Sequence, residues 1–207
     1  GQLCVAKTRL LVHENSKEQV LAAIKAEIKN AFCVGSPLDM QTTFGPIASQ
    51  KQFDRVNGYL KLGQEEGSDL HRLTTAGEQP TTGYFVQPAL FDKVNNTQRI
   101  AQEEIFGPVL SVISFKTEAE AIQLANSVNY GLSAQAWTKD LGRARRLARD
   151  LQAGEITINA TTAPIPANTL WHRLSTEPFG DSGHGVQFGR RGFAAYQRTK
   201  AIQIITD

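Results

Sequence analysis

The feature of this sequence that most restricts its fold is an alternation of short apolar, strand-like segments with helical patterns. Strand-like composition occurs at residues 8–12, 84–91, 109–115, 132–137 and 155–159. Helical apolar spacing lies between them, in stretches of about ten to fifteen residues. Strands joined by helices of this length are typical of a parallel sheet that is covered on both faces. The sequence therefore predicts an α/β fold, a three-layer α/β/α domain with a mostly parallel sheet.

Two serines and a proline set expectations for individual elements. Ser16 and Ser49 each precede an apolar helical repeat, so each is expected to accept a hydrogen bond from the first turn of a helix. The helix after Ser49 is expected to end near Gly67. Pro88 has no N–H to donate, so the strand that contains it is expected at a sheet edge or a bulge.

Composition and charge narrow the class of protein. Apolar residues make up 41% of the 207 residues and charged residues 20%, as in ordinary soluble globular domains. With 22 basic and 20 acidic side chains, the net charge of +2 gives no reason to expect nucleic acid or a membrane as a partner. The basic run at 142–149 is typical of the solvated face of a helix. The apolar run at 109–115 is far shorter than a membrane span.

The two cysteines, Cys4 and Cys33, are too few for a disulfide framework in a chain of this size. Reduced thiols indicate a cytosol-like compartment, so we expect a cytoplasmic protein. Only three residues precede Cys4, and the chain opens inside a motif. We therefore expect that the true N-terminus, and any targeting segment in it, is missing from this sequence.

Cys4 lies just ahead of the first strand-like segment. A cysteine in such a loop is partly exposed in favourable cases, and its thiolate is then a nucleophile. An isolated cysteine is more often a small buried hydrophobic side chain, and Cys33, at the end of an apolar helix face, keeps that interpretation. The residues alone leave both interpretations open for Cys4.

The acidic pair Glu103 and Glu104 leads through a Gly-Pro step into the most apolar strand, at 109–115. Ligands of open α/β sheets commonly bind where strands end, and a carboxylate there can accept a hydrogen bond from a ribose hydroxyl. A solvated turn is the alternative interpretation.

A glycine-rich segment at 177–185 implies unusual backbone conformations or a close approach. It has no Gly-Lys-Ser/Thr sequence, and no Gly-x-Gly-x-x-Gly follows a strand, so the chain carries no dinucleotide-binding signature of its own. His184 has no Cys or His partner at ligand spacing, and we expect no metal site.

Taken in order, several segments of the chain resemble the aldehyde dehydrogenase superfamily. The resemblance runs from Gly1 to about Ile202, so it covers nearly the whole chain. The segments that carry it are Gly-Gln-x-Cys at 1–4, Gly-Tyr-Phe-Val-Gln-Pro-Ala-Leu at 83–90, Glu-Glu-Ile-Phe-Gly-Pro-Val at 103–109, Ala125-Asn126 with 130–134, Ala153-Gly154 with Ile158-Asn159, Pro-Phe-Gly at 178–180, and Tyr196 with Thr199-Lys200.

The resemblance implies a reaction and a set of site residues. Cys4 falls on the cysteine that attacks an aldehyde carbonyl, which gives a thiohemiacetal, then a thioester, and finally a carboxylic acid. The backbone N–H of Cys4 would donate to the oxyanion. The other implied residues are Glu104 and Phe106 at the nicotinamide end of the cofactor, and Ala160, Thr161, Thr162 and Phe179 at the aldehyde substrate.

The resemblance also implies parts that this chain lacks. The cofactor, NAD or NADP, would be bound mainly by an upstream domain that is absent here, and the general-base glutamate and an oxyanion-binding asparagine would also lie upstream. We therefore expect residues 1–198 to be a catalytic domain that does not turn over alone. Residues 199–207 resemble the strand that joins subunits, so we expect a homo-oligomer for the full-length protein.

Two departures and two rival functions remain open. The segment at 160–177 is longer than is usual in the family, and Asp181, Ser182 and Gly183 replace the usual residues after Pro-Phe-Gly, so no substrate class is carried over. A non-catalytic, structural or binding paralogue is the main alternative to the dehydrogenase. A thiol hydrolase that pairs Cys4 with a histidine is the other, although no histidine lies in a known Cys–His signature.

Overall fold

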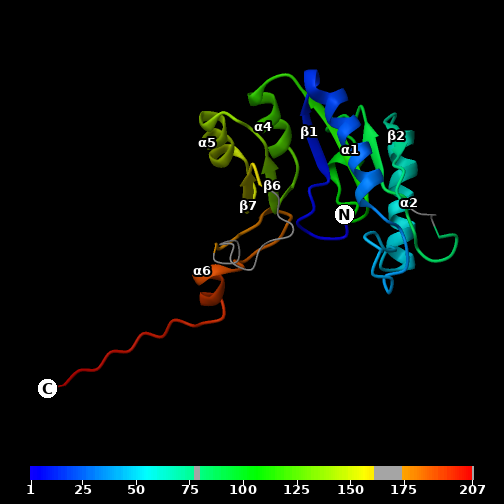
Figure 1. The fold of residues 1–207 in the computed structure, drawn as a ribbon. Helices are drawn as coiled ribbons and strands as arrows, with labels where there is room; N and C mark the ends of the chain where they lie inside the picture. The colour runs from blue at the N-terminus through cyan, green and yellow to red at the C-terminus, as the bar shows by residue number, and fades with distance from the viewer. Residues whose placement is uncertain (77–79, 161–173, 207) are drawn as a thin grey trace. The chain divides into compact units, whose positions relative to one another are not determined.

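The computed structural model of the chain describes residues 1–76, 80–160 and 174–206. The chain forms two compact units, residues 1–128 and residues 129–207 (Figure 1). Each unit combines strands with helices. The strand pairings are mostly parallel, and the predicted α/β class is confirmed, with the three-layer α/β/α arrangement.

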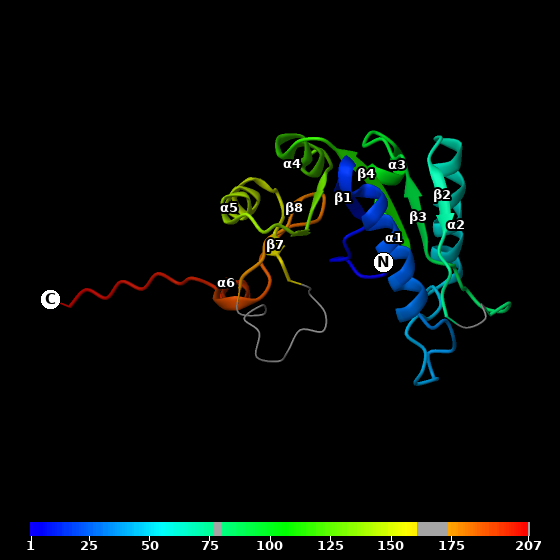
Figure 2. The same ribbon diagram turned by 45° about the horizontal axis from the view of Figure 1, so that its top comes forward.

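A four-stranded sheet forms the centre of the first unit (Figure 2). In spatial order its strands are β1 (Arg9–His13), β4 (Val109–Phe115), β3 (Ala89–Asp92) and β2 (Asp69–Arg72). The most apolar strand, β4, is internal, and it pairs in parallel with β1 and with β3. The edge strand β2 pairs antiparallel with β3.

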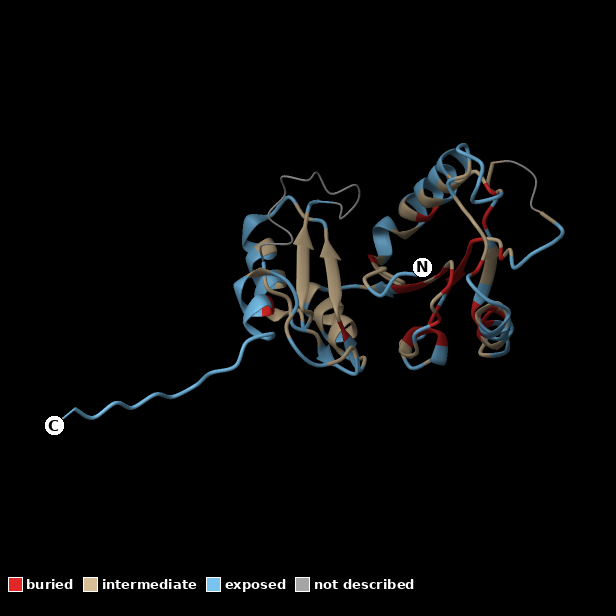
Figure 3. Ribbon diagram, turned by 90° about the horizontal axis from the view of Figure 1, so that it is seen from below, coloured by how far each residue is buried: buried red, intermediate tan, exposed pale blue. Residues whose placement is uncertain are grey.

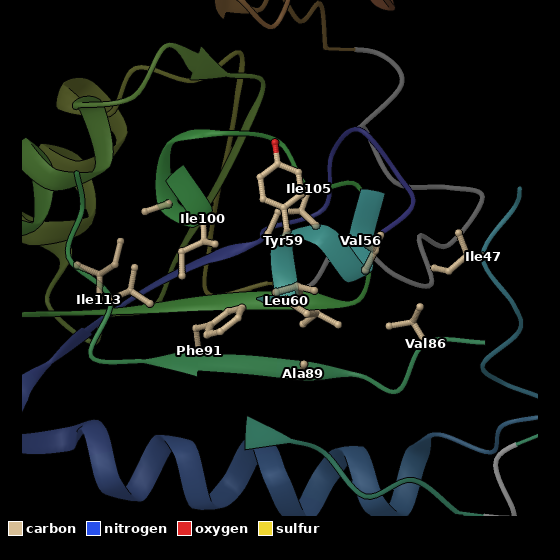
Figure 4. Close-up of a cluster of buried hydrophobic side chains, with 13 residues drawn as sticks. Ile47, Val56, Tyr59, Leu60, Val86, Ala89, Phe91, Ile100, Ile105 and Ile113 are labelled. Carbon is tan, nitrogen blue, oxygen red and sulfur yellow. The ribbon is translucent and has the colours of Figure 1, made fainter. Parts of the chain in front are cut away.

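Helices lie on both faces of this sheet. They are α1 (Lys17–Ala31), which follows the short 3-10 helix η1 (Glu14–Ser16), and α2 (Gln50–Glu65), α3 (Arg99–Gln102) and α4 (Glu118–Asn126). Successive strand residues face opposite sides of a sheet, so the strands supply two cores. Leu90 and Val112 pack with Leu21 of α1 on one face. On the other face, Phe91 packs with Leu60 of α2 (Figure 4).

The expectation for Ser49 is confirmed; Ser16 does lie at the N-cap of α1, but the hydrogen bond expected of its side chain is absent. The hydroxyl of Ser49 accepts a hydrogen bond from the N–H of Gln52 at 3.3 Å, and α2 ends just before Gly67, which has a φ of +89°. Ser16 makes no side-chain capping bond, because it already has helical dihedrals as the last residue of η1.

The expectation that Pro88 confines its strand to an edge is also wrong. β3 begins at Ala89 and is an internal strand, paired on both sides. The first ladder N–H belongs to Ala89, which donates to the Pro108 carbonyl at 2.9 Å. Pro88 therefore precedes the ladder, and its missing N–H interrupts nothing.

The second unit contains two pairs of strands. β6 (Ser133–Ala136) is parallel to β7 (Glu155–Ile158), and the helix that connects them is α5 (Leu141–Asp150). β5 (Tyr130–Gly131) is antiparallel to β8 (Phe179–Gly180), and the short helix α6 (Gly189–Ala194) follows. The arginines of the basic run lie on the exposed side of α5, as the sequence predicted.

Burial differs sharply between the two units (Figure 3). In the part of the chain that the structure describes, every buried hydrophobic side chain belongs to residues 12–113. The strands β6 and β7 are only half-buried along their length.

Residues 197–206 form neither helix nor strand and are exposed. A strand over 199–207 would need a partner strand, so its pairing with another chain stays a prediction. Among the described residues, no helix is both long enough and apolar enough to cross a membrane.

Candidate active site

Cys4 is exposed and forms no disulfide. It lies in a tight turn ahead of β1, closed by a hydrogen bond from the N–H of Ala6 to the carbonyl of Leu3 at 2.9 Å. In the described chain, no residue hydrogen-bonds the Cys4 thiol or its backbone N–H. Of the two interpretations of Cys4, the structure therefore favours the accessible thiol over the buried hydrophobic side chain.

Gln2 fixes the segment that carries this thiol. Its side-chain carbonyl accepts a hydrogen bond from the N–H of Ala48 at 2.9 Å, and its side-chain amide donates to the carbonyl of Pro46 at 3.2 Å. The glutamine of the Gly-Gln-x-Cys sequence thus ties the thiol segment to the loop that precedes α2.

Gly1 brings the thiol segment against the loop that contains the acidic pair. A Cβ at position 1 would lie only 1.8 Å from the carbonyl oxygen of Gly107, so no other residue fits here without displacing backbone. Two sequence motifs that are about a hundred residues apart therefore meet in the first unit.

The loop from Glu103 to Gly107 is held by one face of α2. The side-chain amide of Gln52 donates to the carbonyls of Ile105 and Phe106, both at 2.9 Å. Arg55 donates to the carbonyl of Glu104 at 2.5 Å. Phe106 has a φ of +58°, a left-handed conformation that non-glycine residues adopt only where surrounding contacts impose it.

The two glutamates of this loop have different environments. Glu103 accepts hydrogen bonds from Arg99, at 2.6 and 3.0 Å, and from the Tyr59 hydroxyl at 2.6 Å. These donors, Arg99 first, hold the pKa of the Glu103 carboxyl below its ordinary value. Burial, and next the hydrogen bond to Glu103, raise the pKa of Tyr59.

Glu104, in contrast, is exposed, and its carboxylate accepts a hydrogen bond from no residue in the described chain. Glu103 is therefore engaged within the protein, whereas Glu104 is available to a ligand. Glu104 is thus an unengaged acceptor on an immobilised loop, two residues before Phe106, and a carboxylate in such a position can accept hydrogen bonds from hydroxyl groups of a ligand.

Two of the expected substrate residues, Phe179 and Ala160, are among the described residues, and both belong to the second unit. Phe179 lies on β8 with 47% of its side chain exposed. Ala160 follows β7, is exposed, and accepts a hydrogen bond from the Gln135 side chain. Thr161 and Thr162 lie outside the described residues.

The residues that follow Pro-Phe-Gly are held by hydrogen bonds to the segment at residues 129–131. The hydroxyl of Ser182 accepts from the N–H of Gly131 at 3.0 Å, and the N–H of Asp181 donates to the carbonyl of Asn129 at 2.7 Å. His184 is exposed, and the described residues contain no cluster of three or more metal-ligating side chains.

Sequence reasoning missed the contribution of α2 to this site. Gln52, Arg55 and Tyr59 are spaced three and four residues apart, which places polar groups on one face of a helix whose other side carries Val56 and Leu60 into the core. That spacing was visible in the sequence, but nothing local indicates that the face meets a loop some fifty residues later.

The model described as the aldehyde dehydrogenase family matches residues 1–202. The mitochondrial aldehyde dehydrogenase of Equus caballus is 39% identical over 207 residues, which cover 99% of this chain and 39% of the horse protein. The betaine aldehyde dehydrogenase of Cereibacter sphaeroides is 38% identical over 209 residues, which cover 99% of this chain and 40% of its own length.

Solved structures of aldehyde dehydrogenases also match the chain. An indole-3-acetaldehyde dehydrogenase in complex with NAD+ matches with a TM-score of 0.84 at 37% identity, covering 95% of this chain and 38% of that one. The aldehyde dehydrogenase KauB of Pseudomonas aeruginosa matches with a TM-score of 0.87 at 33% identity, covering 98% and 39%. The chain therefore spans about two fifths of the length of these relatives.

Proposed function

The chain belongs to the aldehyde dehydrogenase family, and from that membership we propose that it is the thiol-bearing catalytic domain of an NAD(P)-dependent aldehyde dehydrogenase. The reaction would convert an aldehyde into a carboxylic acid. The observation that carries the proposal is the meeting of two motifs. The segment with the exposed Cys4 lies against the loop whose free carboxylate is Glu104.

Cys4 would act as the nucleophile. Its thiolate adds to the aldehyde carbon, forming a carbon–sulfur bond and an oxyanion, to which the Cys4 backbone N–H can donate. After loss of hydride from that carbon, the acyl group remains on the Cys4 sulfur as a thioester. Water then opens the thioester and releases the carboxylic acid and the free thiol.

Glu104 and Phe106 would hold the nicotinamide end of the cofactor. Glu104 would accept hydrogen bonds from ribose hydroxyls, and Phe106 would pack beside the ring. NAD or NADP, when bound, supplies the acceptor for the hydride. The NAD+ complex of the indole-3-acetaldehyde dehydrogenase supports NAD as the first cofactor to test.

The isolated chain is proposed to be inactive. The resemblance places the general base and the main cofactor domain upstream of Cys4, and general-base assistance is typically worth ~10²–10⁴-fold. The finer assignments of Ala160, Thr161, Thr162 and Phe179 to the aldehyde, of residues 199–207 to subunit contacts in a homo-oligomer, and of the protein to the cytoplasm are proposals on the same basis.

The test is formation of NADH or NADPH over a panel of aldehydes, using the full-length natural polypeptide that contains this chain and, in parallel, the chain alone. We expect turnover by the full-length protein and none by the chain alone. Glu104→Gln should raise the KM for the cofactor roughly 10- to 150-fold, the usual range for a hydrogen bond to a charged group. A folded full-length protein that binds cofactor but oxidises no aldehyde would favour the non-catalytic paralogue.

A further inference from the structure

The loop that presents Glu104 is fixed on both sides of that residue. On the C-terminal side, Gln52 binds the carbonyls of Ile105 and Phe106. On the N-terminal side, the fixed point is the carboxylate of Glu103, which accepts from Arg99 and from Tyr59. The carbonyl of Glu104 itself accepts a hydrogen bond from Arg55, so the carboxylate of Glu103 anchors the residue just before the one that Arg55 holds.

Tyr59 is suited to hold this fixed point. Its ring is 8% exposed and belongs to the larger hydrophobic core, and Figure 4 shows its hydroxyl directed away from the strands. The hydroxyl lies 2.6 Å from Glu103, and the guanidinium of Arg55 lies 5.2 Å from the ring centroid. The aromatic ring cannot shift without disturbing packing, so the hydroxyl is a rigid donor.

Arg99 supplies the second donor from a different element. It lies on α3, four residues before Glu103, and its guanidinium makes two hydrogen bonds with that carboxylate. Because its side chain is 59% exposed, solvent screens this pair more than the contact with Tyr59.

We propose that Tyr59, with Arg99 in a smaller part, is a positioning residue for cofactor binding: by holding Glu103 it sets the orientation in which Glu104 meets the ribose. The inference rests on the proposed function, because it needs Glu104 to be the group that contacts the cofactor. Tyr59 itself touches neither the cofactor nor the aldehyde in this account.

The experiment is a double-mutant cycle on the full-length polypeptide that contains this chain, with the dissociation constant for NAD as the readout. Tyr59→Phe removes the hydroxyl and keeps the ring. We expect it to raise the dissociation constant roughly 3- to 10-fold in the wild-type background and to have no effect in a Glu104→Gln background, because groups that act through one another are non-additive.

Two further variants separate positioning from loss of stability. Thr43→Val removes hydrogen bonds to the carbonyl of Ala31 and from the N–H of Cys33, away from this loop, and should lower the melting temperature without changing NAD binding. Arg99→Gln alters an exposed side chain, so it keeps the fold, and it should raise the dissociation constant by a smaller factor than Tyr59→Phe. If Tyr59→Phe does not fold, the NAD affinity of Arg99→Gln tests whether the anchoring of Glu103 affects cofactor binding.

The outcomes distinguish this inference from the proposed function. Equal NAD affinity in wild type, Tyr59→Phe and Arg99→Gln would overturn the positioning role and leave the proposed function standing. An effect of Tyr59→Phe that persists undiminished in the Glu104→Gln background would also overturn it, because Tyr59 would then act independently of Glu104. A full-length protein that binds neither NAD nor NADP would overturn both.

Discussion

The two units of the chain differ in how they are stabilised. Residues 1–128 have a sheet with a closed apolar core on each face, including side chains such as Phe91 that are fully buried. Among the described residues of 129–206, only Gly131 and Gly192 are buried, and large side chains such as Trp137 and Phe193 are more than 60% exposed. The first unit therefore carries its own core, whereas several large apolar side chains of the second are exposed.

The candidate residues named above belong to different units. The thiol segment and the loop with Glu104 lie on the well-packed unit, whose rigid elements can hold side chains in fixed positions. The expected substrate residue Phe179 lies on the unit without a closed core. Substitutions in the two units should therefore have unequal effects on stability.

The largest contrast is expected from the same substitution in both units. Phe91→Ala, at a side chain with 0% exposure, should lower the free energy of unfolding by about 3–5 kcal/mol. Phe193→Ala, at 67% exposure, should change it by less than about 0.5 kcal/mol. Urea unfolding followed by far-UV circular dichroism measures both, and equal losses would show that Phe193 packs into a core as Phe91 does.

A smaller difference in stability is expected between two glycine substitutions in α2, and it tests how tightly the core around Phe91 is packed. A Cβ at Gly63 would lie 2.5 Å from the buried Phe91 ring, so Gly63→Ala should destabilise the protein by about 1–3 kcal/mol. Gly58 lies in the same helix with nothing within 4 Å of its Cβ position. Gly58→Ala should therefore stabilise by roughly 0.5–1 kcal/mol. Thermal unfolding compares the pair, and a stabilising Gly63→Ala would mean that the core is loose at this point.

Helix capping offers a comparison between the units with similar chemistry. Ser49→Ala removes the N-cap of α2 and should cost about 1 kcal/mol. Asp140 caps α5 by accepting from the N–H of Arg143 at 3.0 Å. Hydrogen exchange should show Ser49→Ala loosening the first unit and Asp140→Ala loosening only α5 and its neighbours. Spread of the Asp140→Ala effect into residues 1–128, or of the Ser49→Ala effect into α5, would contradict this expectation.

The smallest effect is a pH dependence. Hydrogen bonds, from Arg99 for Glu103 and from the Arg143 N–H for Asp140, lower both folded pKa values from the ordinary 4.5 and 3.8. Because the folded pKa is depressed, the stabilisation is present above those ordinary values and is lost as the pH falls through the folded pKa. Glu103→Gln should reduce the acid sensitivity of the first unit, and Asp140→Asn that of α5. Melting temperatures measured between pH 5 and pH 3 test this. If the melting temperature falls with pH as steeply in both variants as in the wild type, the two carboxylates are not the groups that stabilise the fold in this pH range.

The sequence predicted the fold class and most elements, because apolar periodicity is a local signal. The helix after Ser49 and the internal strand at 109–115 are confirmed. The capping bond expected of Ser16 does not form because Ser16 ends a 3-10 turn with helical dihedrals, and Pro88 does not confine its strand because the ladder begins only at Ala89.

The site was predicted in part. Cys4 and Glu104 could be named from the motifs, but the distinction between Glu103 and Glu104 in hydrogen bonding depends on Tyr59 and Arg99, which the chain brings to the loop only on folding. The same holds for the contact of Gly1 with Gly107. Long-range pairings of this kind leave no local pattern to recognise.

The most direct test of the account is aldehyde-dependent formation of NADH or NADPH by the full-length polypeptide with Cys4 intact and with Cys4→Ala. The account predicts turnover in the first case and none above background in the second, with NAD binding and the melting temperature unchanged. Turnover that survives Cys4→Ala would contradict the assignment of Cys4 as the nucleophile and with it the proposed function of this chain.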